Sequence, residues 1–206
     1  MRALNIAVFA SGQGSNFQAL VHAQRSGLLG PAEVKLLVCD KPAAPVVERA
    51  RQAGVDMFTF QPKEYGSREE YELDILAELA KRQIDLIVLA GYMRLLTPTL
   101  VNPYMGRMIN IHPSLLPAFA GKDAIGQALA YGVKLTGITV HFVDNGMDTG
   151  PIIAQQPAHI HPDDTAETLA ERIHKIEQTL YPRVVSQIAA GKVRLAEDGR
   201  HVIVEQ

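Results

Sequence analysis

The alternation of short apolar runs with longer amphipathic segments constrains the fold of this chain more than any other feature. The apolar runs lie at 4–9, 34–39, 56–60, 85–90 and 108–111, and the amphipathic segments lie near 17–26, 45–53, 68–81 and 97–104. Strands that alternate with helices in this way are typical of βαβ units. The run at 86–89 is apolar on both faces, as in strands covered by helices on each side. The sequence therefore predicts an α/β fold, a doubly wound and mostly parallel sheet with helices on both faces.

The pattern changes after residue 136. Two extended segments, 136–143 and 151–160, flank the turn-rich loop 144–150, and a long helix is expected from about 165 to 189. Asp163, Asp164 or Thr165 could cap that helix. The tail, 192–196 and 201–205, predicts a hairpin around an Asp-Gly turn. Without repeats or a convincing linker, we expect one domain over residues 1–206.

Composition limits the classes of partner. The 206 residues carry a formal net charge of −2 without a block of like charges, which argues against a broad grip on nucleic acid or an anionic membrane. A local anion site stays open. The single cysteine, Cys39, fits a small core residue in a reducing compartment. No apolar stretch approaches the roughly 18 residues of a membrane span, and we expect a cytoplasmic protein.

The segment Asn110-Ile111-His112-Pro113-Ser114 ends one predicted strand. Side chains alternate along a strand, so Asn110 and His112 share a face, and Pro113 marks the strand's end, where open α/β sheets bind ligands. The Asn110 amide can donate a hydrogen bond without titrating, and the His112 imidazole can titrate, so the two form a candidate catalytic pair. The alternative is a strand end whose polar side chains satisfy nearby backbone groups.

A glycine-rich turn follows the first predicted strand and leads into a predicted helix. Its residues are Ser11, Gly12, Gln13, Gly14, Ser15 and Asn16. Glycines permit close backbone approach, and a helix N-terminus favours a phosphate. The dinucleotide pattern lacks its third glycine and the P-loop pattern lacks Gly-Lys-Ser/Thr, so a single phosphate monoester fits better than NAD or ATP. A tight turn with Ser15 or Asn16 as helix cap explains the same residues.

The loop 144–150 contains two aspartates and two glycines. It is too short for an EF-hand, and no HExxH motif or His/Cys cluster appears, so no metal is expected. Asp148 is a solvated turn residue unless folding brings it to His112. His141 reads first as a core or strand-end histidine and second as a supporting residue of the site. The histidines His159, His161, His174 and His201 read as surface or structural residues.

Several motifs resemble one known family. They are residues 9–16 (FASGQGSN), 89–96 (LAGYMRLL), 109–117 (INIHPSLLP) and 140–143 with 147–151 (VHFV, MDTGP). In this order they are similar to the phosphoribosylglycinamide formyltransferases, folate-dependent enzymes of purine biosynthesis. The Asn-x-His-Pro-Ser segment alone marks the wider formyltransferase superfamily.

The resemblance implies roles for individual residues. It implies Asn110, His112 and Asp148 as the catalytic set; Gly12, Gln13, Gly14, Ser15, Asn16 and Glu177 as contacts of phosphoribosylglycinamide; and Arg68, Met93, Arg94, Leu95, Leu96 and Asp144 as contacts of 10-formyltetrahydrofolate. It further implies a phosphate-binding half at about 1–100 and a catalytic and folate half at about 101–206. The formyl donor is a co-substrate, the substrates are small molecules, no metal is used, and a homodimer stays open.

One departure and three rival functions accompany this resemblance. Many relatives carry a histidine pair where residues 121–126 read GKDAIG, and we expect this stretch to shape a pocket edge. Methionyl-tRNA formyltransferase would imply a further nucleic-acid module and a basic balance. Formyltetrahydrofolate hydrolase would imply an added N-terminal regulatory domain, whereas the motifs here begin with the first residues. A non-enzymatic phosphate-sensing module would use residues 11–16 alone.

Overall fold

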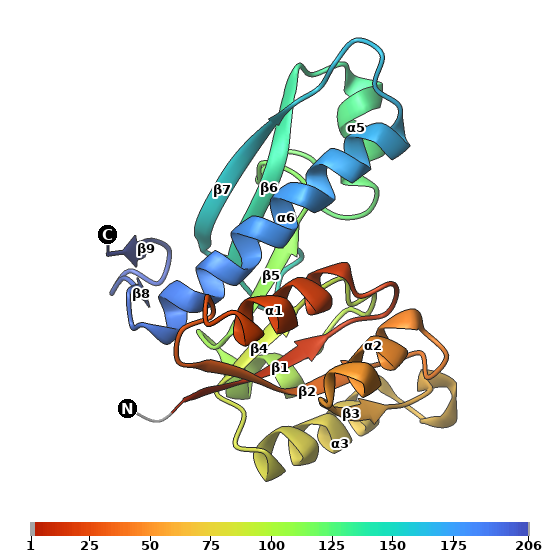
Figure 1. The fold of residues 1–206 in the computed structure, drawn as a ribbon, viewed down its shortest axis with the longest axis vertical. Helices are drawn as coiled ribbons and strands as arrows, with labels where there is room; N and C mark the ends of the chain where they lie inside the picture. The colour runs from red at the N-terminus through yellow and green to blue at the C-terminus, as the bar shows by residue number, and fades with distance from the viewer. Residues whose placement is uncertain (1–2, 206) are drawn as a thin grey trace.

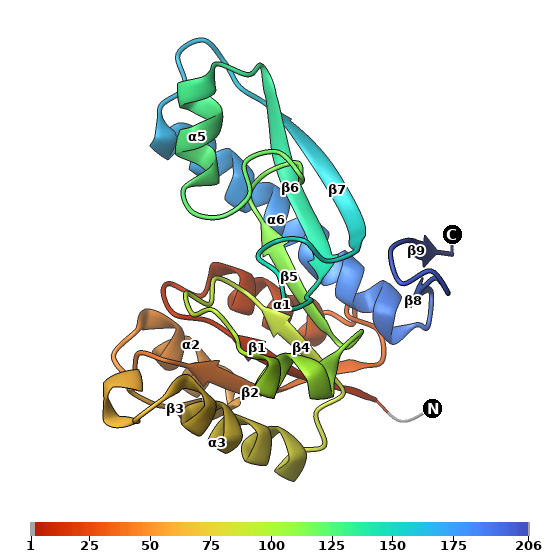
Figure 2. The same cartoon turned by 180° about the vertical axis from the view of Figure 1, so that it is seen from behind.

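The computed structural model describes residues 3–205, which form a seven-stranded sheet with helices on both faces (Figures 1 and 2). The strands are β1 (Leu4–Phe9), β2 (Ala32–Cys39), β3 (Asp56–Thr59), β4 (Leu86–Leu89), β5 (Met108–His112), β6 (Leu135–Phe142) and β7 (Ile152–His159), with a terminal pair β8 (Val193–Leu195) and β9 (Val202–Val204). The α-helices are α1 (Ser15–Arg25), α2 (Pro45–Ala53), α3 (Arg68–Lys81), α4 (Pro98–Val101), α5 (Ala124–Tyr131) and α6 (Ala166–Ala189). Two 3₁₀ turns, η1 (Pro62–Glu64) and η2 (Asn102–Tyr104), complete them.

The strand order in the sheet is β3-β2-β1-β4-β5-β6-β7. Strands β1 to β5 pair in parallel, and β6 and β7 continue the sheet in antiparallel register. The predicted α/β fold with a mostly parallel sheet is confirmed. The order reverses between β1 and β4, which is where sheets of this kind open a crevice for ligands.

Two apolar layers hold the helices to the sheet. One packs α1, α2 and α6 against alternate residues of the strands, such as Ile6 and Val8 of β1. The other packs α3 and α4 against the opposite face, which includes Ala7 and Phe9. Both faces of β1 are therefore buried, which explains its uninterrupted apolar sequence.

The hairpin of β6 and β7 projects beyond the parallel part of the sheet, together with α5 and the first turns of α6 (Figure 1). The expected pattern did not include α5, which begins with Asp123 as its N-cap. The predicted long helix is α6, capped by Thr165 through a reciprocal bond with Thr168. The predicted terminal hairpin is formed by β8 and β9.

The helix expected near 97–104 is interrupted. Its first part is α4, and its second part is the 3₁₀ turn η2, where Pro103 lacks the N–H that an α-helix would use. Within the described residues, none of the helices has both the length and the hydropathy needed to cross a membrane.

Candidate active site

The end of β5 supplies two polar side chains to one face of the sheet. Asn110 lies opposite His141 of β6, and His112 lies opposite Thr139. Their neighbours Ile109 and Ile111 point to the other face and join the core beneath α6. His112 and His141 are both buried, with 6% and 2% of their surfaces exposed. The alternation of the strand therefore separates the polar face from the core, as the sequence predicts.

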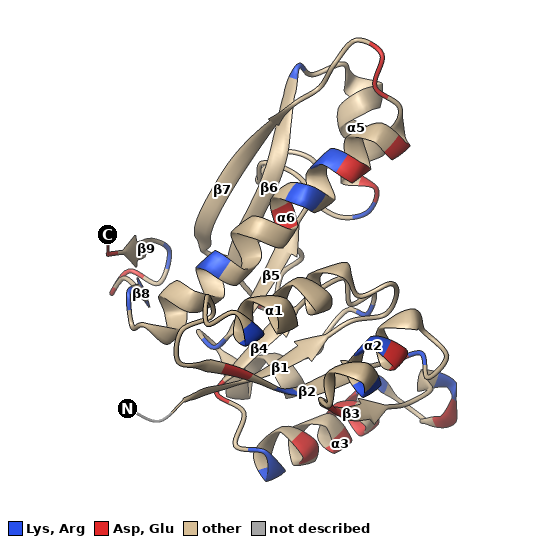
Figure 3. Ribbon diagram, viewed as in Figure 1, with Lys and Arg blue, Asp and Glu red and all other residues tan. Residues whose placement is uncertain are grey.

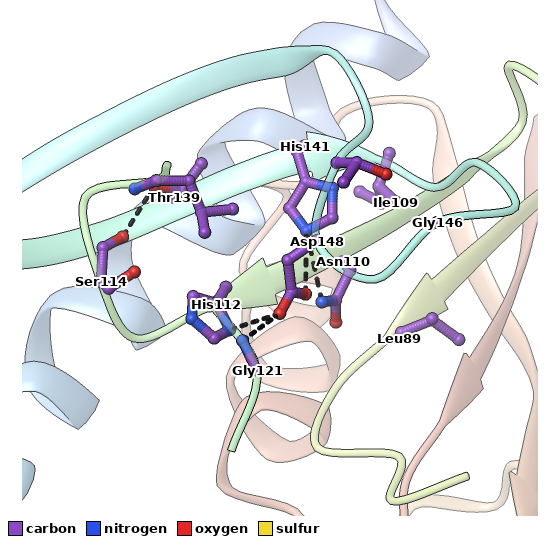
Figure 4. Close-up of polar contacts among 12 residues, drawn as sticks. Leu89, Ile109, Asn110, His112, Ser114, Gly121, Thr139, His141, Gly146 and Asp148 are labelled. Atoms are coloured by element: carbon purple, nitrogen blue, oxygen red, sulfur yellow. Dashed lines mark hydrogen bonds and ion pairs between the residues drawn. The ribbon is translucent and has the colours of Figure 1, made fainter. Parts of the chain in front are cut away.

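Loop 143–150 folds back over this face and brings Asp148 to both histidines (Figure 4). Asp148 Oδ2 lies 3.4 Å from His112 Nδ1, and Asp148 Oδ1 lies 3.7 Å from His141 Nε2. The N–H of Gly121 donates to the same Oδ2 at 2.9 Å. Asp148 has a left-handed φ of 55° and a side chain only 12% exposed. Its interpretation as a solvated turn residue is therefore wrong.

The backbone decides which ring nitrogens carry protons. His112 Nε2 lies 2.9 Å from the Phe119 carbonyl oxygen, which can only accept, so Nε2 is the donor. His112 Nδ1 is then the nitrogen that faces Asp148. His141 shows the same arrangement, because its Nδ1 donates to the Phe142 carbonyl at 2.7 Å and its Nε2 faces Asp148. Each ring thus has an oxygen near both of its nitrogens, a backbone carbonyl at one and the Asp148 carboxylate at the other.

His141 is a buried histidine near the end of β6, and its ring also reaches the predicted catalytic residues. Its Nε2 lies 3.4 Å from Asn110 Nδ2 as well as near Asp148, so it contacts two predicted catalytic residues. Only the pairing of β5 with β6 reveals this proximity. His141 lies directly opposite Asn110 in that pair, so the two side chains share one face of the sheet.

The electrostatics of Asp148 follow from these contacts. The polar contact with His141 is the main cause that lowers the pKa of Asp148, and burial opposes it. The Gly121 N–H and the charge of His112 lower that pKa further. Asp148 is therefore a carboxylate at neutral pH. Residue 121 belongs to the stretch expected to shape a pocket edge, and its backbone holds Asp148 directly.

The turn between β1 and α1 opens toward solvent at a helix N-terminus. Gly14 is the N-cap, with φ 74° and no capping side chain, and Ser15 and Asn16 lie inside the helix. The alternative in which Ser15 or Asn16 caps this helix is therefore wrong. Gly14 packs closely against α2, because a Cβ at this position would lie 2.4 Å from Val46 Cγ2. A Cβ on Gly12 would meet nothing within 4 Å.

Asn16 connects this turn to α6, since its Nδ2 donates to Glu177 Oε2 at 3.1 Å. The fold thus joins two predicted contacts of one substrate that are 161 residues apart. Burial raises the pKa of Glu177, while Asn16 and the charge of His174 act in the opposite direction. The Gln13 carbonyl accepts from Arg49 Nε at 2.8 Å, which steadies the turn.

The predicted folate segment, Met93 to Leu96, is held at three points. Ser11 Oγ accepts from the Met93 N–H at 2.9 Å, Asp40 Oδ2 accepts from Arg94 Nε at 2.7 Å, and buried Glu72 accepts from the Thr97 N–H at 2.8 Å. The side chains of Met93 and Leu95 remain exposed, at 73% and 54%. The anchors thus immobilise the backbone and leave apolar side chains for a ligand.

The two other predicted folate contacts, Arg68 and Asp144, make no hydrogen bond to the segment Met93 to Leu96 among the described residues. Arg68 begins α3, and its charge, like that of Arg94, opposes the effect of burial that raises the pKa of Tyr71. Asp144 closes its own loop by accepting from the Gly146 N–H at 3.0 Å and from Thr149 Oγ1 at 2.8 Å. Its carboxylate therefore shapes the loop that carries Asp148. The described residues contain no cluster of three or more His, Cys, Asp or Glu suited to a metal ion.

The sequence profile of a family described as formyl transferase matches residues 4–185 of this chain. The chain belongs to the formyl transferase family. Within this family, a phosphoribosylglycinamide formyltransferase of Bacillus subtilis is 53% identical over 88% of the chain and 93% of the relative.

Solved structures of this family agree with the fold. Glycinamide ribonucleotide transformylase 1 from Geobacillus kaustophilus is 57% identical, with a TM-score of 0.89 over 91% of this chain and 100% of that one. The enzyme of the same name from Symbiobacterium toebii is 40% identical, with a TM-score of 0.95 over 99% of this chain and 95% of that one.

Proposed function

We propose that this chain transfers the formyl group of 10-formyltetrahydrofolate to the glycinamide amine of 5′-phosphoribosylglycinamide, a step of purine biosynthesis. The observation that carries the proposal is the convergence of Asn110, His112 and Asp148 at the end of β5, in a chain similar to transformylases over nearly its whole length. A phosphate sensor would need only the turn before α1, and so would not account for this convergence.

The reaction needs groups that stabilise a tetrahedral species. The amine attacks the formyl carbon, the carbonyl oxygen becomes an oxyanion, and donors aimed at that oxygen lower the barrier. Asn110 Nδ2 donates without titrating. His112 contributes through Nδ1, because its Nε2 is engaged by the Phe119 carbonyl and its Nδ1 lies 3.4 Å from Asp148 Oδ2.

The proton balance assigns a role to Asp148. The attacking amine loses a proton as the new C–N bond forms, and the folate nitrogen gains one as the old C–N bond breaks. Asp148, which its lowered pKa keeps ionised at neutral pH, relays that proton between the two nitrogens through water. His141 holds the opposite oxygen of Asp148 and so orients it.

The two substrates occupy the two sides of this centre. The phosphate binds at the N-terminus of α1, where the backbone of Gly12 to Asn16 presents N–H groups, and Glu177 binds the ribose. The folate binds along Met93 to Leu96, beneath loop 143–150, with Arg68 at its outer end. Buried Cys39 and the net charge of −2 support a cytoplasmic enzyme without nucleic-acid or membrane partners.

The test is formyl transfer measured with the purified chain, both substrates present, against two controls. Omitting phosphoribosylglycinamide should abolish loss of the formyl group, whereas a hydrolase would release formate without it. Thermal stabilisation supplies a second readout: a transferase is stabilised by the ribonucleotide and by a folate analogue, and a sensor by the phosphate compound alone. Formate release that does not depend on the ribonucleotide would overturn the proposal.

A further inference from the structure

A row of three residues crosses the outer strands on the catalytic face of the sheet. His112 of β5 pairs with Thr139 of β6, and Thr139 pairs with Gln155 of β7. Side chains of directly paired residues share one face of an antiparallel sheet, so Gln155 lies on the face that carries His112. None of the roles described above uses Gln155.

The Thr139 hydroxyl joins this row to loop 113–121, which follows β5. The hydroxyl donates to the Ser114 carbonyl oxygen at 2.7 Å and accepts from the Leu116 N–H at 3.0 Å (Figure 4). Ser114 Oγ donates in turn to the Ala118 carbonyl oxygen at 2.6 Å. Thr139 and Ser114 are both fully buried, so the first part of the loop is held firmly against β6.

Gln155 completes this attachment from the outermost strand. Its Nε2 donates to the Leu116 carbonyl oxygen at 2.9 Å and to Thr139 Oγ1 at 3.0 Å. A carbonyl oxygen can only accept, and the Thr139 hydroxyl has already given its proton to Ser114, so both partners of Gln155 require a donor. The amide nitrogen of Gln155 therefore faces the loop, and both of its hydrogens are used.

Loop 113–121 also supplies both backbone groups that hold the predicted catalytic side chains. The Phe119 carbonyl oxygen lies 2.9 Å from His112 Nε2, and the Gly121 N–H donates to Asp148 Oδ2 at 2.9 Å. Both groups follow Leu116 in the same short loop, so a shift at Leu116 displaces them together. A misplacement of about 1 Å at a reacting centre can cost as much as 10²-fold in rate.

The surroundings of Gln155 are exposed and uncharged. Its side chain lies at the surface of the hairpin, whereas Thr139 is buried. Strands β6 and β7 contain no Lys, Arg, Asp or Glu (Figure 3). The two hydrogen bonds of Gln155 therefore join neutral groups. Such bonds contribute little to stability at an exposed position, so we expect their loss to change Tm little.

We propose that Gln155 is a positioning residue for the reaction: through Leu116 it sets the loop whose backbone holds His112 and Asp148. This inference rests on the proposed function, which supplies the reaction. The printed partners of the Gln155 side chain do not include a residue assigned to either substrate. We therefore expect loss of its donor to lower kcat about tenfold, at low and at high salt alike, while both KM values stay near normal.

The experiment measures kcat and both KM values for variants that differ in what they offer the loop. Gln155→Met offers no donor, Gln155→Glu keeps the shape but places an acceptor against two acceptors, and Gln155→Lys keeps a donor. The matched control is Gln156→Met, the next residue of β7, which points to the opposite face. We expect kcat to fall about tenfold in Gln155→Met and further in Gln155→Glu, to recover in Gln155→Lys, and to stay unchanged in Gln156→Met.

A double variant tests whether Gln155 acts through Asp148. If the loop transmits its effect, Gln155→Met should cost much less in an Asp148→Asn background than in the wild type, because the group that the loop positions is already lost. Thermal melts establish that each protein is folded at the assay temperature. If Gln155→Met were unfolded there, Gln155→Glu against Gln155→Lys supplies the same comparison of an acceptor with a donor.

The outcomes separate the two proposals. Absence of formyl transfer by the wild type would overturn the proposed function itself. With transfer present, an unchanged kcat in Gln155→Met, a raised KM in place of a lowered kcat, or an equal loss in Gln156→Met would each overturn the positioning role alone. Full multiplication of the Gln155→Met and Asp148→Asn losses would also overturn it, because the two residues would then act independently.

Discussion

At the scale of single residues, the site depends on one carboxylate shared by two imidazoles. Asp148 reaches His112 with one oxygen and His141 with the other, and the Phe119 and Phe142 carbonyls hold the far nitrogens of the two rings. This arrangement leaves each ring one nitrogen that faces Asp148. Removing the charge of Asp148 therefore affects both histidines.

We expect Asp148→Asn to lower kcat by about 10²-fold or more while the KM values stay near normal, because the amide keeps the size of the carboxylate but cannot accept the proton and carries no negative charge. His112→Ala should cost a similar factor, and the double variant much less than the product of the two. Steady-state rates with thermal melts check this. Wild-type turnover in Asp148→Asn would leave Asp148 as a loop residue only.

The pH dependence of stability has the sign set by the lowered pKa of Asp148. A carboxyl group whose pKa is lower in the folded protein contributes stability above its unfolded pKa, near 3.8, and loses it as the pH falls through the folded value. Glu177 has the opposite sign, since burial raises its pKa above 4.5. Its contribution is complete below pH 4.5 and is lost as the pH rises through the folded pKa.

Glu177→Gln should therefore stabilise the protein at pH 7, by about 1 kcal/mol or a Tm increase of about 2–4 °C, while it raises KM for phosphoribosylglycinamide. The amide can still face Asn16 and no longer carries a buried charge. Melts between pH 4 and 7 should show the gain growing with pH. A gain of the same size at pH 4 would contradict burial of the charge as its cause.

At the scale of elements, the loops after β1 and β4 place both substrates, and they are fastened to each other. Ser11, in the turn that leads to α1, accepts from the Met93 N–H, and the Ser11 N–H donates to the Gly91 carbonyl at 3.0 Å. A shift in either loop therefore moves the other. The crevice at the reversal of strand order is formed by this pair of loops.

The two glycines before α1 are expected to differ in function. Gly12→Ala places a methyl in open space where the phosphate would approach, so KM for phosphoribosylglycinamide should rise with little change in Tm. Gly14→Ala puts a methyl against Val46 at a left-handed φ, and should lower stability by about 1–2 kcal/mol. Kinetics and melts on both variants decide it. Equal effects on the two substrates would argue against a phosphate at this turn.

At the scale of the whole molecule, α6 joins the two parts of the sheet. Tyr181 lies fully buried inside α6, and its hydroxyl contacts the carbonyl oxygens of Leu89 in β4, at 2.7 Å, and Ile109 in β5, at 3.2 Å. The same helix carries Glu177 to Asn16, one turn away. The helix that seals the core thus also positions a proposed substrate contact.

Tyr181→Phe should lower the free energy of unfolding by about 1–3 kcal/mol, because two buried carbonyls lose a donor while the ring still fills its place. Denaturant unfolding measures this loss. At 25 °C, kcat should change little, since the hydroxyl touches no proposed substrate. A large loss of kcat at unchanged stability would show that β4 and β5 transmit its position to Asn110.

The sequence by itself determined the elements and the class of sheet, because apolar periodicity and helix caps are local properties. It predicted β1, α2 and α3 with the bounds that the structure has, and it placed Asn110 and His112 on one face by strand alternation alone. It did not predict α5, whose short pattern follows an irregular turn and carries no strong amphipathic signal.

Only the tertiary structure decided which distant residues meet. Asp148 reaches His112 because loop 143–150 folds back with a left-handed residue, and His141 joins them because β6 pairs with β5 in one register. The local apolar periodicity of the sequence predicts neither the path of a loop nor the register of an antiparallel strand pair. Both are decided by which side chains become buried together, so the site existed in the sequence as separate residues and became a site only through long-range packing.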